Sequence, residues 1–230
     1  VIMGCSEETG MEDMEYYVQN CVHPVASLIP DSMFPANYAQ KGSIKGLFYA
    51  PAGEQIVEFN GGEVFNMVPP GATALLRGVK PFAAPQGVEM EEENGMLRVR
   101  ATGTAAHAAR PEGGVSAIHL LATALLDAGV LSGQSEAAMR AFAQLSGDIY
   151  GERAGIACED EDTGRSTMVC GMARMENGKL SLSVDCRLSI ATNVEGDSET
   201  LQAYGAGLGF EPREFSTTLP VYIPKDGPLI

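Results

Sequence analysis

The 230-residue sequence contains no tryptophan, only three histidines and few basic residues. Its 15 Lys and Arg stand against 30 Asp and Glu, which gives a formal net charge of −15. Because nucleic-acid binding needs a basic surface, this balance argues against nucleic acid as a partner. We find neither an apolar run long enough to cross a membrane as a helix nor a signal peptide, so we expect no membrane association.

The five cysteines offer no closely spaced pair. They stand at positions 5, 21, 158, 170 and 186, which excludes the short ligand spacing of a zinc ribbon. An odd number of cysteines without local pairs also argues against a disulfide framework. We therefore expect a reducing compartment, the cytoplasm.

What the sequence does contain is enough apolar material for a sizeable core. Hydrophobic residues make up 45% and charged residues 20% of the chain, which is typical of a globular protein of one large domain or two modest ones. The sequence begins inside an expected strand and ends where a helix is expected to start. We therefore expect further segments on both sides.

The first stretch of interest is an apolar run that leads into two adjacent carboxylates, Glu7 and Glu8. It is typical of a buried parallel strand whose carboxyl end carries chemistry. A helix is expected over 12–20, and a second apolar run over 25–29 leads to Asp31. This order predicts a β-α-β unit with acids at its rim. The alternatives are a solvated acidic turn for Glu7 and Glu8 and an Asx-turn for Asp31.

From residue 43 the pattern changes to hairpins and amphipathic helices. Strands are expected over 43–50, 55–60, 64–70, 72–76, 88–93, 96–102, 167–175, 179–188 and 219–224, with Asn-Gly turns at 94–95 and 177–178. Helices are expected over 115–128, 135–145 and 197–208. The predicted fold class is α/β: a partial parallel-sheet core (1–42 and 219–230) with a large α+β insert (43–218).

Three residues of this insert could contact a ligand. His107 lies in a loop of small residues between a strand and a helix, where it could meet a ligand or only form surface hydrogen bonds. Asn66 is either a turn residue or a hydrogen-bond donor to substrate. Arg187 shares the polar face of a strand with Asp185, so a cross-strand salt bridge is its alternative. His119 and His23 are expected to be structural.

The residues at the carboxyl ends suggest a dinuclear metal hydrolase. Such a site needs carboxylates and imidazoles around two ions and a further carboxylate that deprotonates water. Glu7, Glu8 and Asp31 supply the acids, but no histidine follows a strand end near them. We therefore expect this chain alone to bind metal weakly.

These residues together resemble the PepV-like dipeptidases, clan MH di-zinc metallopeptidases related to carnosinases, succinyl-diaminopimelate desuccinylases and acetylornithine deacetylases. The resemblance spans essentially the whole chain. It rests on the motifs at 6–10, 30–35, 41–42, 61–69, 103–113 and 185–187. None of these motifs is specific alone, whereas their order and spacing together are.

The resemblance implies a role for each site residue. Glu7 would be the general base, and Glu8 and Asp31 would be ligands of two zinc ions, with Mn²⁺ or Co²⁺ as alternatives. His107 would stabilise the oxyanion from a lid domain over 43–218. Asn66 and Arg187 would hold the intermediate and the carboxylate of a small peptide substrate. The intact protein would be a monomer or a homodimer.

The sequence also departs from this family. The family's first His-x-Asp motif and its bridging Asp would precede residue 1, and its last His ligand would follow residue 230. Cys5-Ser6 stands where Thr-Asp is usual. We therefore expect a lid-bearing fragment that is inactive alone. The alternatives are an amidohydrolase that removes acyl groups and a non-catalytic dimerisation or binding module.

Overall fold

The computed structural model describes residues 2–5, 11–25, 27 and 37–226. By its internal contacts the chain divides into two compact units, 1–37 and 38–230. Each unit is described by itself below. No helix of the described residues is both long and apolar enough to cross a membrane.

In the first unit the described secondary structure is α1 (Glu12–Asn20), the helix predicted over 12–20. Acidic side chains occupy its first turn, where the positive end of the helix dipole favours them. None of its residues is buried.

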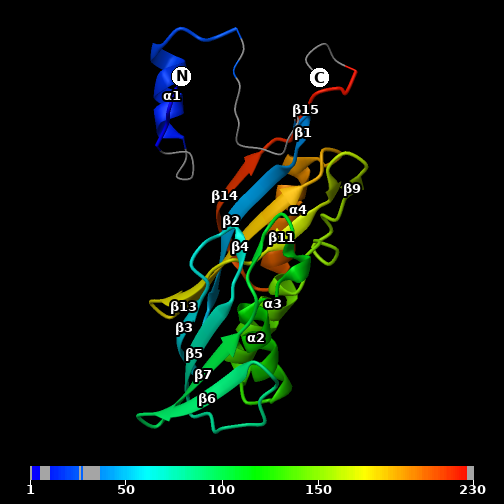
Figure 1. The fold of residues 1–230 in the computed structure, drawn as a ribbon. Helices are drawn as coiled ribbons and strands as arrows, with labels where there is room; N and C mark the ends of the chain where they lie inside the picture. Colours follow the sequence, from blue (N-terminus) through cyan, green and yellow to red (C-terminus); the bar gives the residue numbers. More distant parts are fainter. Residues whose placement is uncertain (1, 6–10, 26, 28–36, 227–230) are drawn as a thin grey trace. The chain divides into compact units, whose positions relative to one another are not determined.

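The second unit is built on a nine-stranded sheet, drawn in Figure 1. Eight strands follow the order β14-β2-β13-β12-β3-β5-β7-β6. The ninth strand, β11, pairs with a different part of β13 from the part that pairs with β12. The strands are β2 (Gly42–Pro51), β3 (Ile56–Gly61), β5 (Gly71–Arg77), β6 (Val88–Glu93), β7 (Met96–Thr102), β11 (Thr167–Val169), β12 (Ala173–Glu176), β13 (Lys179–Leu188) and β14 (Glu211–Thr218).

Three further strand pairs have two residues in each strand. They are β1 (Ala39–Gln40) with β15 (Val221–Tyr222), β4 (Met67–Val68) with β8 (Ala106–His107), and β9 (Glu159–Asp160) with β10 (Gly164–Arg165). A 3-10 turn spans Pro111–Gly113. Two-residue pairs of this kind have little stability of their own, so their positions depend on what they pack against.

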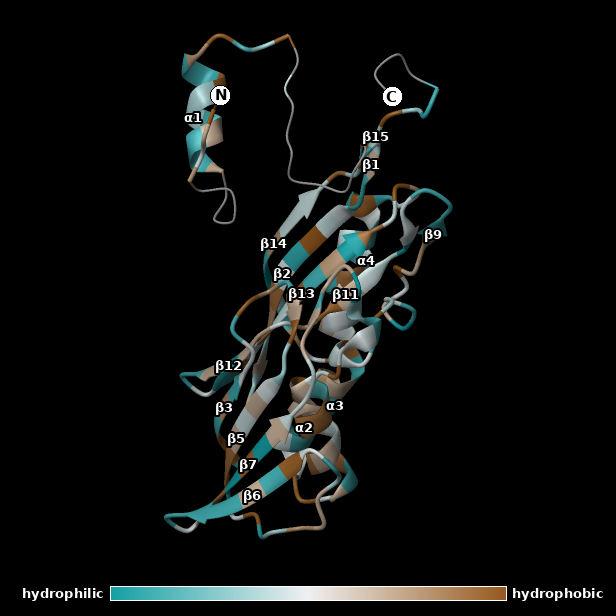
Figure 2. Ribbon diagram, viewed as in Figure 1, coloured by the Kyte–Doolittle hydropathy of each residue, from teal (hydrophilic) through white to brown (hydrophobic). Residues whose placement is uncertain are grey.

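The helices α2 (Ala117–Asp127), α3 (Gly133–Ser146) and α4 (Val194–Gly207) lie along one face of the long sheet (Figure 1). Apolar residues of the sheet, including Phe48, Phe59 and Leu97, pack with helix residues such as Leu121 and Phe142 in one core. Figure 2 shows the alternation of apolar and polar residues along the strands that directs one face to this core.

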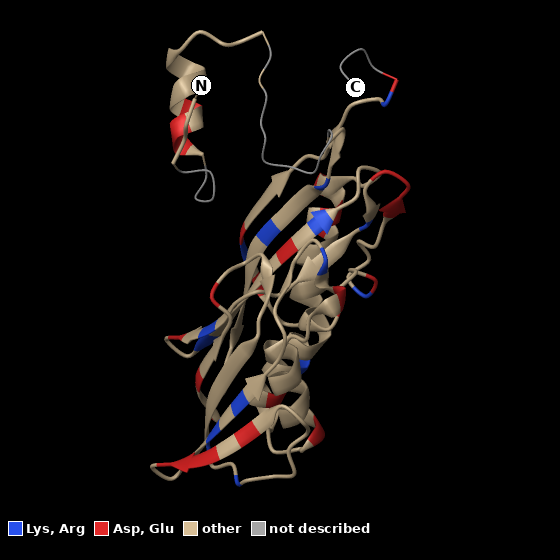
Figure 3. Ribbon diagram, viewed as in Figure 1, with Lys and Arg blue, Asp and Glu red and all other residues tan. Residues whose placement is uncertain are grey.

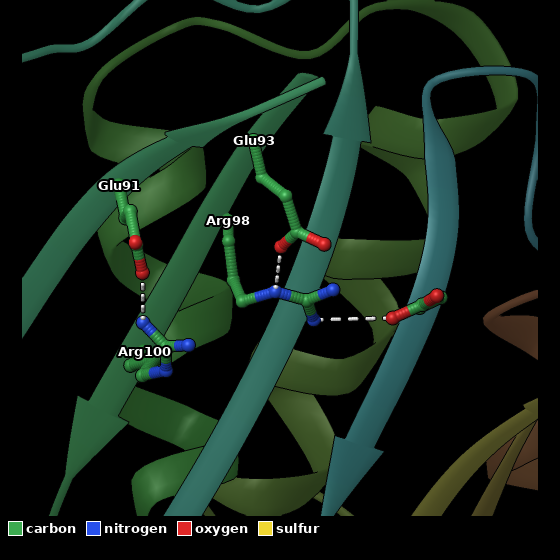
Figure 4. A network of polar contacts seen from close by, with 5 residues as sticks. Glu91, Glu93, Arg98 and Arg100 are labelled. Carbon is green, nitrogen blue, oxygen red and sulfur yellow. Dashed lines mark hydrogen bonds and ion pairs between the residues drawn. The ribbon is translucent and has the colours of Figure 1, made fainter. Parts of the chain in front are cut away.

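Towards its β6 edge the sheet carries charged residues, acidic on β6 and basic on β7 (Figure 3). Arg98 bridges Glu58 (3.1 Å) and Glu93 (2.5 Å), and Arg100 contacts Glu91 at 2.9 Å (Figure 4). A charged face and a charged edge strand discourage pairing with further strands.

The prediction of a parallel β-α-β core is wrong for the described residues. Every pairing among their strands is antiparallel, including that of β1 with β15. Ile2 and Met3, expected in a buried strand, are 51% and 91% exposed and lie in no strand. An apolar run becomes a buried parallel strand only where neighbouring strands pair with it, and the described residues provide none. Most of the second run, 25–29, lies outside them.

Several element boundaries also differ from expectation. The strand expected over 167–175 is two strands, β11 and β12, which both pair with β13. Ser135, expected to cap α3, is instead buried within it, and its hydroxyl donates to the Ala52 carbonyl at 2.9 Å. Ser132 precedes the helix. The local pattern predicted that the Ser135 side chain caps the helix, but it forms a tertiary hydrogen bond instead.

Candidate functional site

Asn66 and His107 meet where β4 and β8 pair. Met67 lies opposite His107, and Val68 opposite Ala106. The Ala108 amide then donates to the Asn66 carbonyl at 2.9 Å. Pairing of two short segments that are distant in the sequence therefore makes neighbours of two residues that were each predicted to contact substrate.

A small apolar cluster packs against this strand pair. Val68, Ala108 and Val169 are buried together, with Ala106 packed against them, apart from the main core. Gly114 lies so close that a β-carbon there would be 2.9 Å from the Ala106 Cβ and 3.0 Å from the Val68 methyl carbons. A side chain at this glycine would therefore displace the strand pair.

Arg187 is linked to the same place through β11. Its register partner is Thr167, and the Thr167 hydroxyl donates to the Ala108 carbonyl at 2.7 Å. Ala108 thus has its amide bonded towards Asn66 and its carbonyl towards the strand opposite Arg187. The segments that carry the three predicted lid residues are therefore linked through this one buried alanine.

The guanidinium of Arg187 is fixed by a buried carboxylate. Asp185 is fully buried and accepts from Arg187 Nε at 2.7 Å and from Nη2 at 3.0 Å. The alternative considered for Arg187, a salt bridge with Asp185, is therefore present, but it runs along β13 rather than across strands. The Arg187 side chain remains 26% exposed, and a guanidinium has five N–H donors. It can therefore bind Asp185 and a further acceptor at once.

His107 is exposed, and its ring orientation is set locally. Nδ1 accepts a hydrogen bond from the Ala109 amide at 3.1 Å. A neutral imidazole that accepts at Nδ1 carries its proton on Nε2. The ring therefore offers an N–H donor, the group that stabilises an oxyanion.

An open groove of about 770 Å³ lies on the polar side of the sheet, next to the site. Its lining includes Met67, the register partner of His107, and a row of opposed residues across four strands: Arg174, Asn60, Thr73 and Arg100. The Arg174 guanidinium already donates to the carbonyls of Gly61, Gly62 and Ala173. Asn66, His107 and Arg187 do not line the groove.

The predicted general base and metal ligands, Glu7, Glu8 and Asp31, lie outside the described residues. Within the described part of the chain, no group of three or more His, Cys, Asp or Glu could hold a metal ion. Two carboxylates alone would also fall short of the three protein ligands of a catalytic zinc site. The two predicted ligands, Glu8 and Asp31, therefore suit zinc in kind but are too few for a catalytic site.

Sequence reasoning did not single out Thr167 or the carbonyl of Ala108. The two-residue period placed Arg187 on the outer face of β13, but nothing in that period says which segment lies opposite. The sequence hint for Thr167 was weak: it is a threonine two residues before Val169, which is buried in the small apolar cluster.

The fold defines a helix-backed antiparallel domain in which backbone and side-chain hydrogen bonds link the segments that carry Asn66, His107 and Arg187. No family model matches the chain. It is 27% identical over 249 residues to the Bacillus subtilis (strain 168) protein named Putative dipeptidase YtjP, an alignment that covers 100% of this chain and 53% of that protein. The chain is thus homologous to a putative dipeptidase and spans about half its length.

Among solved structures, the aminoacylhistidine dipeptidase from Vibrio alginolyticus is similar with a TM-score of 0.37 and 14% sequence identity. The similarity covers 86% of this chain and 44% of that one.

Proposed function

We propose that this chain is the lid-bearing part of a zinc-dependent dipeptidase that hydrolyses dipeptides or short peptides with activated water. The observation that carries the proposal is the linkage of the segments that carry Asn66, His107 and Arg187 through hydrogen bonds to Ala108. Homology to a putative dipeptidase supports it independently. Because the alignment covers 53% of that relative, the activity proposed is that of a larger enzyme.

In this proposal each described residue binds a different part of the reacting peptide. The Nε2–H of His107 donates to the carbonyl oxygen as it becomes an oxyanion, and the Asn66 side chain assists it. Arg187, held by Asp185, binds the free carboxylate of the dipeptide through its remaining donors. A site that binds this carboxylate favours short peptides over long ones.

In this proposal the metal chemistry belongs to the first unit, residues 1–37. Bound zinc, or Mn²⁺ or Co²⁺ in its place, would polarise the scissile carbonyl and make water acidic. Glu8 and Asp31 would supply carboxylate ligands, and Glu7 would take the proton from the attacking water. Because Glu8 and Asp31 are fewer than the three protein ligands of a catalytic zinc site, we expect the 230-residue chain alone to be inactive on dipeptides.

We further propose that 43–218 form the lid and that 1–42 and 219–230 belong to the catalytic part. Both boundaries lie beside the pair of β1 and β15, where Ala39 is opposite Tyr222 and Gln40 opposite Val221. The two segments that lead into and out of the long sheet therefore run side by side. A paired ribbon at this point suits a hinge between a lid and a catalytic domain.

The test uses the full-length protein that carries this sequence, assayed on a panel of dipeptides and N-acyl amino acids. Glu7→Gln should lower dipeptide turnover by a factor on the order of 10² or more and leave the metal content unchanged. Glu12→Gln, in the exposed first turn of α1, is the matched control and should keep full activity. Undiminished turnover by Glu7→Gln would remove Glu7 from this role, and a preference for N-acyl amino acids would replace the dipeptidase assignment.

A further inference from the structure

Thr167 occupies a position that connects two separate sheets. Its side chain lies on the outer face of β11, because register partners share a face and its partner is Arg187. It is only 2% exposed. Its hydroxyl donates to the Ala108 carbonyl at 2.7 Å in a buried hydrogen bond.

The strands β4 and β8 form their own two-stranded sheet, which shares no ladder with the nine-stranded one. The chain connects β4 directly to β5 and β7 to β8, and the place of His107 relative to Arg187 depends in addition on contacts between the two sheets. These contacts include the apolar cluster of Val68, Ala108 and Val169 and the hydrogen bond of Thr167. The apolar cluster is not directional, whereas the hydrogen bond specifies distance and angle.

We propose that Thr167 is a positioning residue that aligns His107 and Asn66 with Arg187 in the site. Its hydroxyl holds the Ala108 carbonyl, and the Ala108 amide holds the Asn66 carbonyl at 2.9 Å. This inference rests on the proposed function for its catalytic consequence. It does not rest on it for the structural linkage, which the chain alone can test.

The expected consequence is large for the size of the change. A shift of about 1 Å in a catalytic group costs up to about 10²-fold in rate. Removing the hydroxyl leaves the Ala108 carbonyl buried without its partner, so the strand pair is expected to move or open. Arg187 stays in β13, so the binding of the substrate carboxylate is expected to change little.

The first experiment compares Thr167→Val, which removes the hydroxyl at nearly constant volume, with Thr167→Ser, which keeps it. In the full-length enzyme Thr167→Val should lower kcat about tenfold or more while KM changes less than about threefold. Thr167→Ser should keep kcat close to the wild-type value. Thr200→Val is the control, because the Thr200 hydroxyl donates to Gly196 within α4 at 2.8 Å. Equal kcat per folded enzyme in Thr167→Val and wild type would overturn the proposal.

The second experiment uses the 230-residue chain and needs no activity. Amide hydrogen exchange should become at least about tenfold faster at Ala108 in Thr167→Val, as local opening becomes easier, and remain unchanged at Val184 in the core of β13. Unchanged exchange at Ala108 would overturn the linkage. If exchange accelerates while the full-length protein hydrolyses no peptide, the linkage stands and the proposed function fails.

Discussion

The ion pair of Asp185 and Arg187 allows a sharp stability prediction, because the chain contains a matched pair at the surface. In β13 Asp185 is fully buried and the Arg187 side chain is 26% exposed. In β14 Glu211 and Arg213 have the same spacing, acid first and arginine two residues later, but their side chains are 50% and 55% exposed. The two pairs therefore differ strongly in their exposure to water, and Glu211 also has Lys179 as a second partner at 3.6 Å.

We expect Asp185→Asn to destabilise the second unit by about 2–4 kcal/mol. Removing one partner of a buried pair costs about 3–5 kcal/mol, and the partial exposure of Arg187 lets water recover some of this. With a urea dependence of about 2 kcal/mol per M, the unfolding midpoint should fall by about 1–2 M. Glu211→Gln should leave the midpoint unchanged, because exposed pairs contribute little.

The assay is urea unfolding followed by far-UV circular dichroism, which suits a chain without tryptophan. A double-mutant cycle with Arg187→Gln separates the pair from its surroundings, since Asp185→Asn should cost less once the arginine is gone. If Asp185→Asn and Glu211→Gln shift the midpoint equally, burial does not decide the strength of this pair. Arg187 would then not be held in the way that the proposed site requires.

Two further predictions concern titratable groups inside the second unit. Burial raises the pKa of the Cys170 thiol to about 12 and raises the pKa of the Cys186 thiol well above its usual range. A thiol reagent at neutral pH should therefore label the exposed Cys5 and Cys21 and reach the two buried thiols only after unfolding. Rapid labelling of all four in the native protein would contradict this. Burial also lowers the pKa of His119 in the folded state below its usual value of 6.5. As the pH drops below about 6.5, the unfolded chain therefore binds a proton at this histidine more readily than the folded chain does. The free energy of unfolding should then fall. Urea midpoints at about pH 7.5 and 5.5 should show a smaller loss in His119→Gln than in the wild type, and equal losses would contradict the assignment.

The local features of the fold could be predicted from the sequence because short-range physics determines them. The Asn-Gly turns at 94–95 and 177–178 have positive φ at all four residues, the geometry that a two-residue hairpin demands. The pair β6–β7 and the start of β13 lie where these turns place them. The apolar face of β13, from Leu180 to Leu188, is fully buried, as its two-residue period predicts.

The strand pairing of the long sheet could not be predicted in the same way. β14 lies beside β2 although the two are distant in the sequence, and a local pattern contains no information on a distant partner. The expected parallel core failed for the same reason: an apolar run shows that a segment can be buried, but not which strands surround it.

The candidate site divides along the same line. The sequence alone supplied the residue types, an imidazole in a loop of small residues and an arginine two positions after an aspartate on a polar strand face. Only the tertiary structure placed Asn66 beside His107, through a strand pair of two residues each, and connected both to Arg187 through Thr167. The physical reason is that side-chain chemistry belongs to each residue, whereas proximity results from hydrogen bonds and packing between segments that the chain brings together only when it folds.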